Sequence, residues 1–261
     1  MVWTIVRTVS ALSLMGGALS FAVAASENPD RRYETIWVIH ADESQAGTRN
    51  VAVGSPIIEQ RLLPFGLAET VEDIRSASGD VLVEKGRQLF RLGVASGKTF
   101  CVVEVPRPSF YRSFMLGGGN LQLCLIDSDD DGVFDGHFNG GNPMRGVPFI
   151  SGKQPRNPKP ASGKYSLLTP DQFARPYTVR VSLASARVSS KGDPQITYRI
   201  DFGDDVTRQK LTNFISGGIG HTEILGAQWN ALEIGDDAVK VDVTHAMPNQ
   251  PFQAVRTVAY R

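Results

Sequence analysis

Residues 121–141 read LQLCLIDSDDDGVFDGHFNGG, and the rest of the chain is organised around this stretch. The first part, LQLCLI, has the pattern of a β-strand rather than that of a helix. The part that follows carries five aspartates within the nine residues 127–135, together with one glycine. The sequence therefore predicts a strand that runs directly into a tight and strongly acidic loop.

The spacing of these acidic residues is typical of a calcium-binding loop. Aspartates occupy alternate positions at its start, and another follows three residues after the central glycine. Calcium needs about six to eight oxygen ligands, and a tight loop can supply several from alternate side chains. The glycine permits a sharp turn, after which the next carbonyl can point inward. We predict a structural calcium ion held by Asp127, Asp129, Asp131, Asp135 and the backbone carbonyl of Val133.

Over residues 127–135 alone, the loop resembles the first nine positions of an EF-hand calcium loop, D-x-D-x-D-G-x-x-D. The twelfth position is Phe138, where the EF-hand has a bidentate glutamate, so the resemblance implies a weak site with a Kd of about 10⁻⁴ to 10⁻³ M. The flanking segments are strand-like upstream and glycine-rich downstream. The resemblance therefore implies a calcium loop of this type inserted in another scaffold.

A solvated acidic turn without a metal is the alternative, because aspartate and glycine are common turn residues. Like charges about 4 Å apart repel by about 1 kcal/mol even in water, and by more near a protein surface. Five carboxylates on one short loop therefore favour a cation among them.

The first 25 residues are predicted to be a signal peptide, 1–25. Arg7 supplies the positive charge, an apolar run follows over 9–23, and residues 22–24 read AVA, a small-residue cleavage site. The apolar run is short and interrupted, so no stable membrane span is expected after cleavage, although an uncleaved anchor is the alternative. We expect a periplasmic or secreted protein, and the absence of any Asn-x-Ser/Thr acceptor favours a bacterial envelope.

The charges of the chain balance, with 27 lysines and arginines against 27 aspartates and glutamates. Removal of the signal peptide would take away only Arg7 and leave a net charge near −1. Nothing in this balance attracts polyanions, so no nucleic acid is expected as a partner.

The two cysteines, Cys101 and Cys124, both lie in strand-like segments. An even number of cysteines in an oxidising compartment predicts a disulfide bond between neighbouring strands. Two buried free thiols are the alternative. Cys124 lies three residues before Asp127, so a disulfide would fix one end of the acidic loop.

The later part of the chain shows regular alternation of apolar and polar residues, which is typical of antiparallel sheets packed on one face. The residues expected to share buried faces are Val179, Val181 and Leu183 in one segment and Ile196, Tyr198, Ile200 and Phe202 in the next. We therefore predict an all-β fold, an antiparallel β-sandwich or barrel in one or two domains, with few short helices.

The mature chain divides by pattern into three regions. A β domain with the disulfide and the acidic loop is predicted over 26–150, and an antiparallel β region over 165–261. Between them, 151–164 is rich in proline and lysine and is predicted to be a loop or linker. One short helix is expected over 68–77.

A long insertion between two predicted strands carries an aromatic cluster flanked by arginines. Such a cluster is either a surface that contacts a partner or a plug over one end of the fold. The residues concerned are Phe110, Tyr111, Phe114 and Met115.

No residue stands out as catalytic or cofactor-binding. The segment 93–99, GVASGKT, is one residue short of a phosphate-binding loop and leads into a strand, so a hairpin turn is expected there. The histidines lack zinc spacing, no G-x-S-x-G motif occurs, and no carboxylate pair is singled out. An enzyme is therefore the less favoured reading.

The favoured hypothesis is an exported calcium-binding β protein with a structural, adhesive or binding role in the cell envelope. Its partners would be the calcium ion and an envelope protein or glycan. The alternative is an exported hydrolase of polysaccharide or peptide that contains a structural calcium ion.

Overall fold

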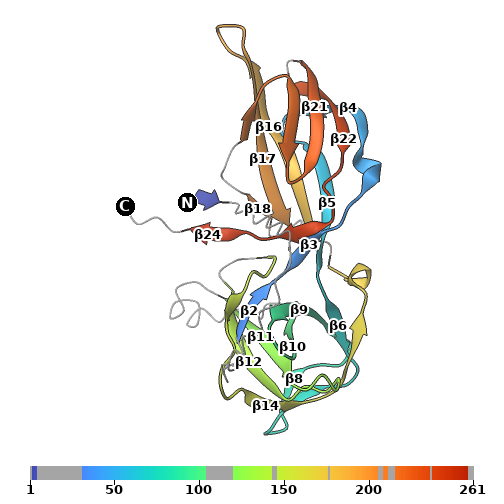
Figure 1. The fold of residues 1–261 in the computed structure, drawn as a ribbon, viewed down its shortest axis with the longest axis vertical. Helices are drawn as coiled ribbons and strands as arrows, with labels where there is room; N and C mark the ends of the chain where they lie inside the picture. The colour runs from blue at the N-terminus through green and yellow to red at the C-terminus, as the bar shows by residue number, and fades with distance from the viewer. Residues whose placement is uncertain are drawn as a thin grey trace, which may run out of the picture.

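The computed structural model describes residues 2–4, 31–103, 120–142, 146–175, 177–204, 208–210, 215–235 and 237–257. Within these ranges the regular structure is almost entirely β-strand, with the short 3₁₀ helices η1 (Glu43–Gln45) and η2 (Pro170–Gln172). The strands form two lobes, one above the other along the long axis of the molecule (Figure 1). The predicted all-β fold is confirmed.

The upper lobe of Figure 1 is a sandwich of a larger and a smaller antiparallel sheet. The larger sheet has the spatial order β18 (Gln209–Lys210), β17 (Pro194–Gly203), β16 (Thr178–Val188), β5 (Pro56–Pro64), β3 (Trp37–Ile39) and β23 (Gln250–Phe252), with β19 (Ile215–Gly217) also paired to β17. The smaller sheet has the order β20 (Gly220–Ile224), β21 (Ala227–Ile234), β22 (Ala238–His245) and β4 (Gly47–Ala52).

The alternation seen in the sequence corresponds to the buried face of the larger sheet. Every residue predicted to face inward on β16 and β17 has an exposed fraction of at most 2%. These side chains pack against β21 and β22, whose own alternate residues are also buried. The pattern of period two therefore predicted the correct face of these strands.

The lower lobe is built on a curled sheet. Its order is β13 (Ser151–Lys153), β2 (Arg32–Thr35), β9 (Gln88–Val94), β10 (Lys98–Val102), β11 (Asn120–Asp127), β12 (Gly136–Asn142), β14 (Lys159–Ser162), β7 (Ile74–Ser76) and β8 (Val81–Val83). β6 (Leu67–Thr70) pairs with β9 and with β15 (Tyr165–Leu168). Separately, β1 (Val2–Thr4), within the predicted signal peptide, pairs with β24 (Val255–Thr257).

The central strands of the lower lobe are buried on both faces. Phe100 and Leu125 belong to a small apolar cluster on one side, whereas Cys101 and Cys124 belong to the main core on the other. A strand with two buried faces needs apolar residues at consecutive positions. This two-sided burial explains the nearly continuous apolar run that precedes the acidic loop.

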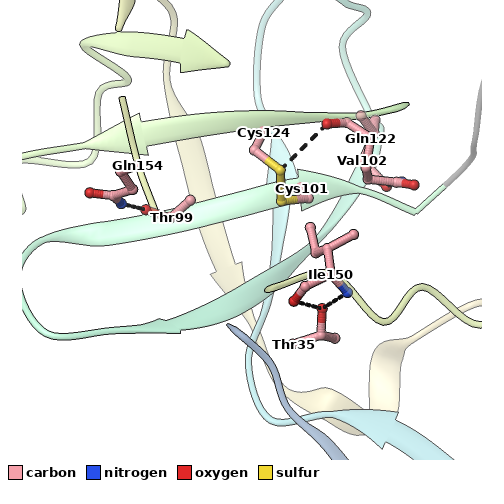
Figure 2. Close-up of a disulfide and its surroundings, with 8 residues drawn as sticks. All are labelled: Thr35, Thr99, Cys101, Val102, Gln122, Cys124, Ile150 and Gln154. Atoms are coloured by element: carbon pink, nitrogen blue, oxygen red, sulfur yellow. Dashed lines mark hydrogen bonds between the residues drawn. A yellow bond between two sulfur atoms is a disulfide. The ribbon is translucent and has the colours of Figure 1, made fainter. Parts of the chain in front are cut away.

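The predicted disulfide is confirmed. Cys101 on β10 lies directly opposite Cys124 on β11, and their sulfur atoms are 2.02 Å apart (Figure 2). Next to it, Gln154 Nε2 donates a hydrogen bond of 2.6 Å to Thr99 Oγ1 (Figure 2). The disulfide therefore joins β11, the strand that leads into the acidic loop, to its neighbour β10 within the buried core.

Strands from the first predicted β region pair with strands from the second, so the two regions do not form separate sheets. β4 and β5, from 26–150, pair with β22 and β16, from 165–261. The segment 151–164, predicted to be a loop or linker, instead contains β13 and β14, and 68–77, expected as a helix, contains parts of β6 and β7. These short strands need no apolar periodicity of their own, because existing sheet edges satisfy their backbone groups.

Replacing both cysteines by alanine is expected to lower the free energy of unfolding by about 3 kcal/mol, because the disulfide closes a long loop in the unfolded chain. The sequence separation of the two cysteines is 23 residues. Denaturant unfolding of the Cys101→Ala/Cys124→Ala variant beside the oxidised wild-type protein measures the difference. Wild-type protein kept reduced is the matched control, because it retains both sulfur atoms, and equal stability of the oxidised and reduced forms would contradict the expectation.

Candidate metal site

The acidic loop connects two adjacent antiparallel strands, since β11 ends at Asp127 and β12 begins at Gly136. Two residues with positive φ turn its backbone, Asp130 at 65° and Gly132 at 85°. Aspartate is one of the few residues besides glycine that adopt this left-handed conformation readily. The turn brings Asp135 back to the start of the loop, where its Oδ2 accepts the backbone N–H of Ser128 at 2.7 Å.

The carboxylate of Asp127 is fully buried and accepts several hydrogen bonds. Its Oδ1 accepts the backbone N–H of Asp130 at 2.7 Å, and its Oδ2 accepts that of Gly132 at 3.2 Å. The hydroxyl of Tyr165 donates to the same Oδ2 at 2.6 Å. Burial of a carboxylate is strongly unfavourable without such donors, so these bonds fix both its position and its orientation.

Three carboxylates converge in the loop. One carboxylate oxygen from each of Asp127, Asp129 and Asp135 lies within 4.8 Å of those of the other two residues. Asp127 is buried, whereas the side chains of Asp129 and Asp135 are exposed. Calcium binds oxygen at about 2.3–2.6 Å, so two ligands on opposite sides of one ion are about 5 Å apart. We name these residues the acidic triad, and their spacing suits a single cation.

The other two predicted ligands are placed differently. Asp131 is not part of the acidic triad, and its Oδ1 accepts the backbone N–H of Val133 at 2.7 Å. Val133 forms a single β-bridge with Lys164, just before β15. These contacts tie the middle of the loop to the next segment of the fold. Metal binding by Asp131 and by the Val133 carbonyl stays a prediction.

An aromatic cluster lies beneath the loop. The Phe134 and Tyr165 rings stack with centroids 4.6 Å apart, and Phe100 lies 5.0 Å from Tyr165. Burial of Tyr165, and next its hydrogen bond to Asp127, raise the pKa of its phenol well above the ordinary value. The hydroxyl therefore remains a proton donor to the buried carboxylate at neutral pH. Sequence reasoning missed Tyr165, because its link to the loop spans 38 residues.

The turn between β9 and β10 packs against the acidic loop. These strands form the antiparallel hairpin that we predicted for GVASGKT. A Cβ atom on Gly97, whose φ is +66°, would lie 2.7 Å from the backbone oxygen of Asp127, so a larger residue does not fit there. Lys98 Nζ lies 3.3 Å from Asp130 Oδ1 and brings a positive charge to the loop. Sequence reasoning did not identify Lys98 as a neighbour of the site.

A pocket of about 310 Å³ lies on the upper lobe, between the end of β3 and the outer face of β5. One of its lining carboxylates is neutralised, since Glu59 Oε1 accepts hydrogen bonds from Thr178 at 2.9 Å and from the neighbouring Arg180 at 2.7 Å. Hydrogen bonds from Ser44 lower the pKa of Asp42, which is therefore a carboxylate and not a proton donor at neutral pH. The negative charge of Glu59 at the pocket is therefore balanced by the guanidinium of Arg180.

The predicted partner contacts Phe110, Tyr111, Phe114 and Met115 lie outside the described residues. In the part of the chain that the structure describes, no helix has the length and apolar character needed to span a membrane.

Comparison with known proteins gives no family model, no curated protein and no solved structure that matches this chain. The fold and the site together define a disulfide-bonded all-β protein with an acidic cluster close enough to bind a metal ion.

The stability of the folded protein is expected to fall as the pH rises above about 10, partly because of Tyr165. The pKa of Tyr165 is raised above its ordinary value of 10.0 in the folded state, so its contribution is complete below that pH and is lost as the pH rises toward the folded pKa. Tyr165→Phe should therefore show a shallower loss of stability as the pH rises above about 10.

The measurement is the free energy of unfolding in urea at several pH values. Tyr177→Phe is the comparison variant: burial raises the pKa of Tyr177 as well, so this variant should also show a shallower loss of stability above about pH 10, without removing a hydrogen bond to the acidic loop. An identical pH dependence for wild type and Tyr165→Phe would show that the hydroxyl of Tyr165 plays no such part.

Proposed function

We propose that this protein is an exported calcium-binding β protein, with a structural, adhesive or binding role in the cell envelope. The observation that supports this proposal best is the convergence of the acidic triad, Asp127, Asp129 and Asp135, within 4.8 Å. Calcium in this site is structural, and the contact with an envelope protein or glycan is a further part of the proposal.

The donor set favours calcium over other common metals. The acidic triad offers carboxylate oxygens, which are hard ligands, and contains neither histidine nor cysteine. Magnesium requires near-ideal octahedral geometry at about 2.0–2.1 Å and keeps several waters, whereas calcium tolerates irregular loops. An irregular loop with two exposed carboxylates suits the larger and more adaptable ion.

A bound ion would stabilise several segments that are distant in the sequence. The loop contacts β15 through the hydrogen bond from Tyr165 to Asp127. It contacts the β9–β10 turn through the ion pair of Lys98 with Asp130. Neutralising the acidic triad would therefore strengthen one end of the lower lobe, which supports a structural role for the metal.

Export of the protein is part of the proposal. The disulfide between Cys101 and Cys124 is compatible with an oxidising compartment outside the cytosol. The signal peptide predicted over 1–25 would supply the route, and we propose a periplasmic or secreted location. A weak site with a Kd of about 10⁻⁴ to 10⁻³ M is typical of extracellular calcium-binding modules.

Calcium at about ten to a hundred times its Kd is expected to raise the free energy of unfolding by about 1 to 3 kcal/mol relative to chelator. The physical reason is that the ion binds the converged carboxylates of the folded state and not the dispersed ones of the unfolded chain. Thermal unfolding with calcium, with magnesium and with chelator measures this effect. No shift at about 10 mM calcium, which is about ten to a hundred times the expected Kd, would refute the proposal.

Charge-neutral variants of the loop sharpen this test. Asp129→Asn and Asp135→Asn should abolish the calcium-dependent shift, because each removes a charged ligand of the acidic triad. Asp130→Asn is the matched control, since it removes the same charge from the same loop at a residue outside the triad. Asp131→Asn then decides whether that side chain is a ligand, as predicted from the sequence. Equal loss in Asp129→Asn and Asp130→Asn would show only a general effect of charge.

An exported hydrolase of polysaccharide or peptide is the second candidate function, and the pocket on the upper lobe is the observation that favours it. His40 Nε2 lies 3.9 Å and Arg61 Nη1 lies 3.6 Å from Asp171 Oδ1, so a histidine and a carboxylate meet at its edge.

If the pocket is catalytic, hydrolysis of envelope polysaccharides or peptides by the purified protein should be lost in His40→Ala and Asp171→Asn. The calcium-dependent stability should remain unchanged in both variants, because the pocket and the acidic loop share no residues. Absence of hydrolysis by the wild-type protein, measured by release of reducing ends or free amines, would exclude this candidate for the substrates tested.

A further inference from the structure

Among the buried polar side-chain atoms that make no hydrogen bond in the described part of the chain, two belong to one pair of rings in the core of the upper lobe. They are Oη of Tyr198 on β17 and Nε1 of Trp229 on β21. Both side chains have an exposed fraction of 0%. Buried polar groups in folded proteins are almost always hydrogen-bonded, so each unpaired atom requires a physical explanation.

The two unpaired atoms belong to neighbouring rings from facing sheets. The ring centroids of Tyr198 and Trp229 are 5.2 Å apart, and the planes are nearly perpendicular at 80°. One ring comes from the larger sheet and the other from the smaller sheet. The two rings therefore pack against each other in the interior, where the sheets meet.

A third polar group borders this region. Thr222 on β20 lies directly opposite Trp229, so the two side chains are on the same face of the sheet. A Cβ atom on Gly217 of β19 would lie 3.4 Å from Tyr198 Cε2 and 3.6 Å from Thr222 Oγ1. Gly217 therefore lies close to both Tyr198 and Thr222, and it places no side chain between them. Thr222 is partly exposed and gives this region a side facing solvent.

The chemistry of the three groups defines what they bind. The indole N–H of Trp229 can only donate, whereas the hydroxyls of Tyr198 and Thr222 can donate or accept. A group bonded to both rings must therefore accept a hydrogen bond from the indole, which requires an oxygen or a comparable acceptor. The buried core residues nearby on the same strands, including Ile196 and Ala231, are apolar, so a charged ligand would not be compensated.

We propose that the upper lobe holds a small neutral oxygen acceptor between Tyr198 Oη and Trp229 Nε1, with Thr222 on the side of access. Its oxygen belongs either to a buried water molecule or to the hydroxyl or carbonyl group of a small molecule. Ordered water commonly satisfies buried polar groups of this kind, and it needs about two to four polar partners. The proposal is independent of calcium binding, because the acidic triad lies in the lower lobe.

The first experiment is nuclear magnetic resonance of the indole N–H groups in the full-length protein. Trp229→Phe assigns the Trp229 resonance, and Trp37 is an internal control because its Nε1 donates to the Pro148 carbonyl at 2.8 Å. Cross-relaxation from the Trp229 indole proton to a bound partner is expected, with none for Trp37. A signal at the water frequency identifies water, a signal elsewhere that no protein proton explains identifies a small molecule, and the absence of both overturns the proposal.

A double-mutant cycle gives an independent readout. If one ligand bridges both rings, Tyr198→Phe should lower the midpoint of thermal unfolding by about 2–4 °C. Its effect should also be non-additive with that of Trp229→Phe, because each variant removes a contact to the same ligand. If the atoms are truly unpaired, Tyr198→Phe should raise the midpoint and the effects should add, which would overturn the proposal.

Tyr177→Phe is the matched control at another buried tyrosine, which has an exposed fraction of 1%. Its ring packs against Trp37 and not against the Tyr198–Trp229 pair. This variant should leave the Trp229 indole resonance unchanged, whereas Tyr198→Phe should shift it. An equal shift in both variants would count against a ligand that is specific to the Tyr198–Trp229 region.

Discussion

The hydrogen-bonded carboxylate of Asp127 is the interaction on which the acidic loop depends. Because this group is fully buried at the end of β11, its charge requires donors, and the loop supplies two backbone N–H groups by turning sharply through Asp130 and Gly132. Tyr165 supplies a third donor from β15. The same constraint that shapes the loop therefore also joins it to a strand far along the chain. Exposed aspartates converge beside this fixed group, so the acidic triad is close enough to bind a metal ion.

The position of the loop follows from the packing below it. β10 and β11 are buried on both faces and are joined by the disulfide, so the strand that ends at Asp127 is held firmly. Phe134 extends from the loop into the small apolar cluster with Phe100 and Tyr165. The loop that carries the exposed carboxylates is thus held in three ways: by the disulfide on the preceding strand, by the packing of Phe134, and by the hydrogen bonds of Asp127. A rigid support of this kind suits a site that binds an ion without reacting.

Local sequence patterns predicted the β class, the buried faces of β16 and β17, the disulfide, and an acidic cluster at 127–135. They failed where long-range pairing decides the structure. Residues 151–164 form β13 and β14 because other strands offer backbone partners, although their own sequence is rich in proline and lysine. Tyr165 and Lys98 reach the loop through the tertiary fold, and no spacing in the sequence marks them. Metal binding by Asp131 stays a prediction, and in the structure its carboxylate accepts the backbone N–H of Val133.

The interleaved pairing of the upper lobe has a consequence for how the chain folds. β5 pairs with β16 across more than a hundred residues, as in the pair Arg61 and Thr178. The sequence separation between β4 and its partner β22 is larger still. Contacts this distant in sequence slow folding, because a long loop must close before they form. The lower lobe uses many pairs that are close in sequence, such as β9 with β10 and β11 with β12. During folding, the lower lobe can therefore assemble first, while the open edges of β4 and β5 remain the segments most exposed to aggregation or to a chaperone.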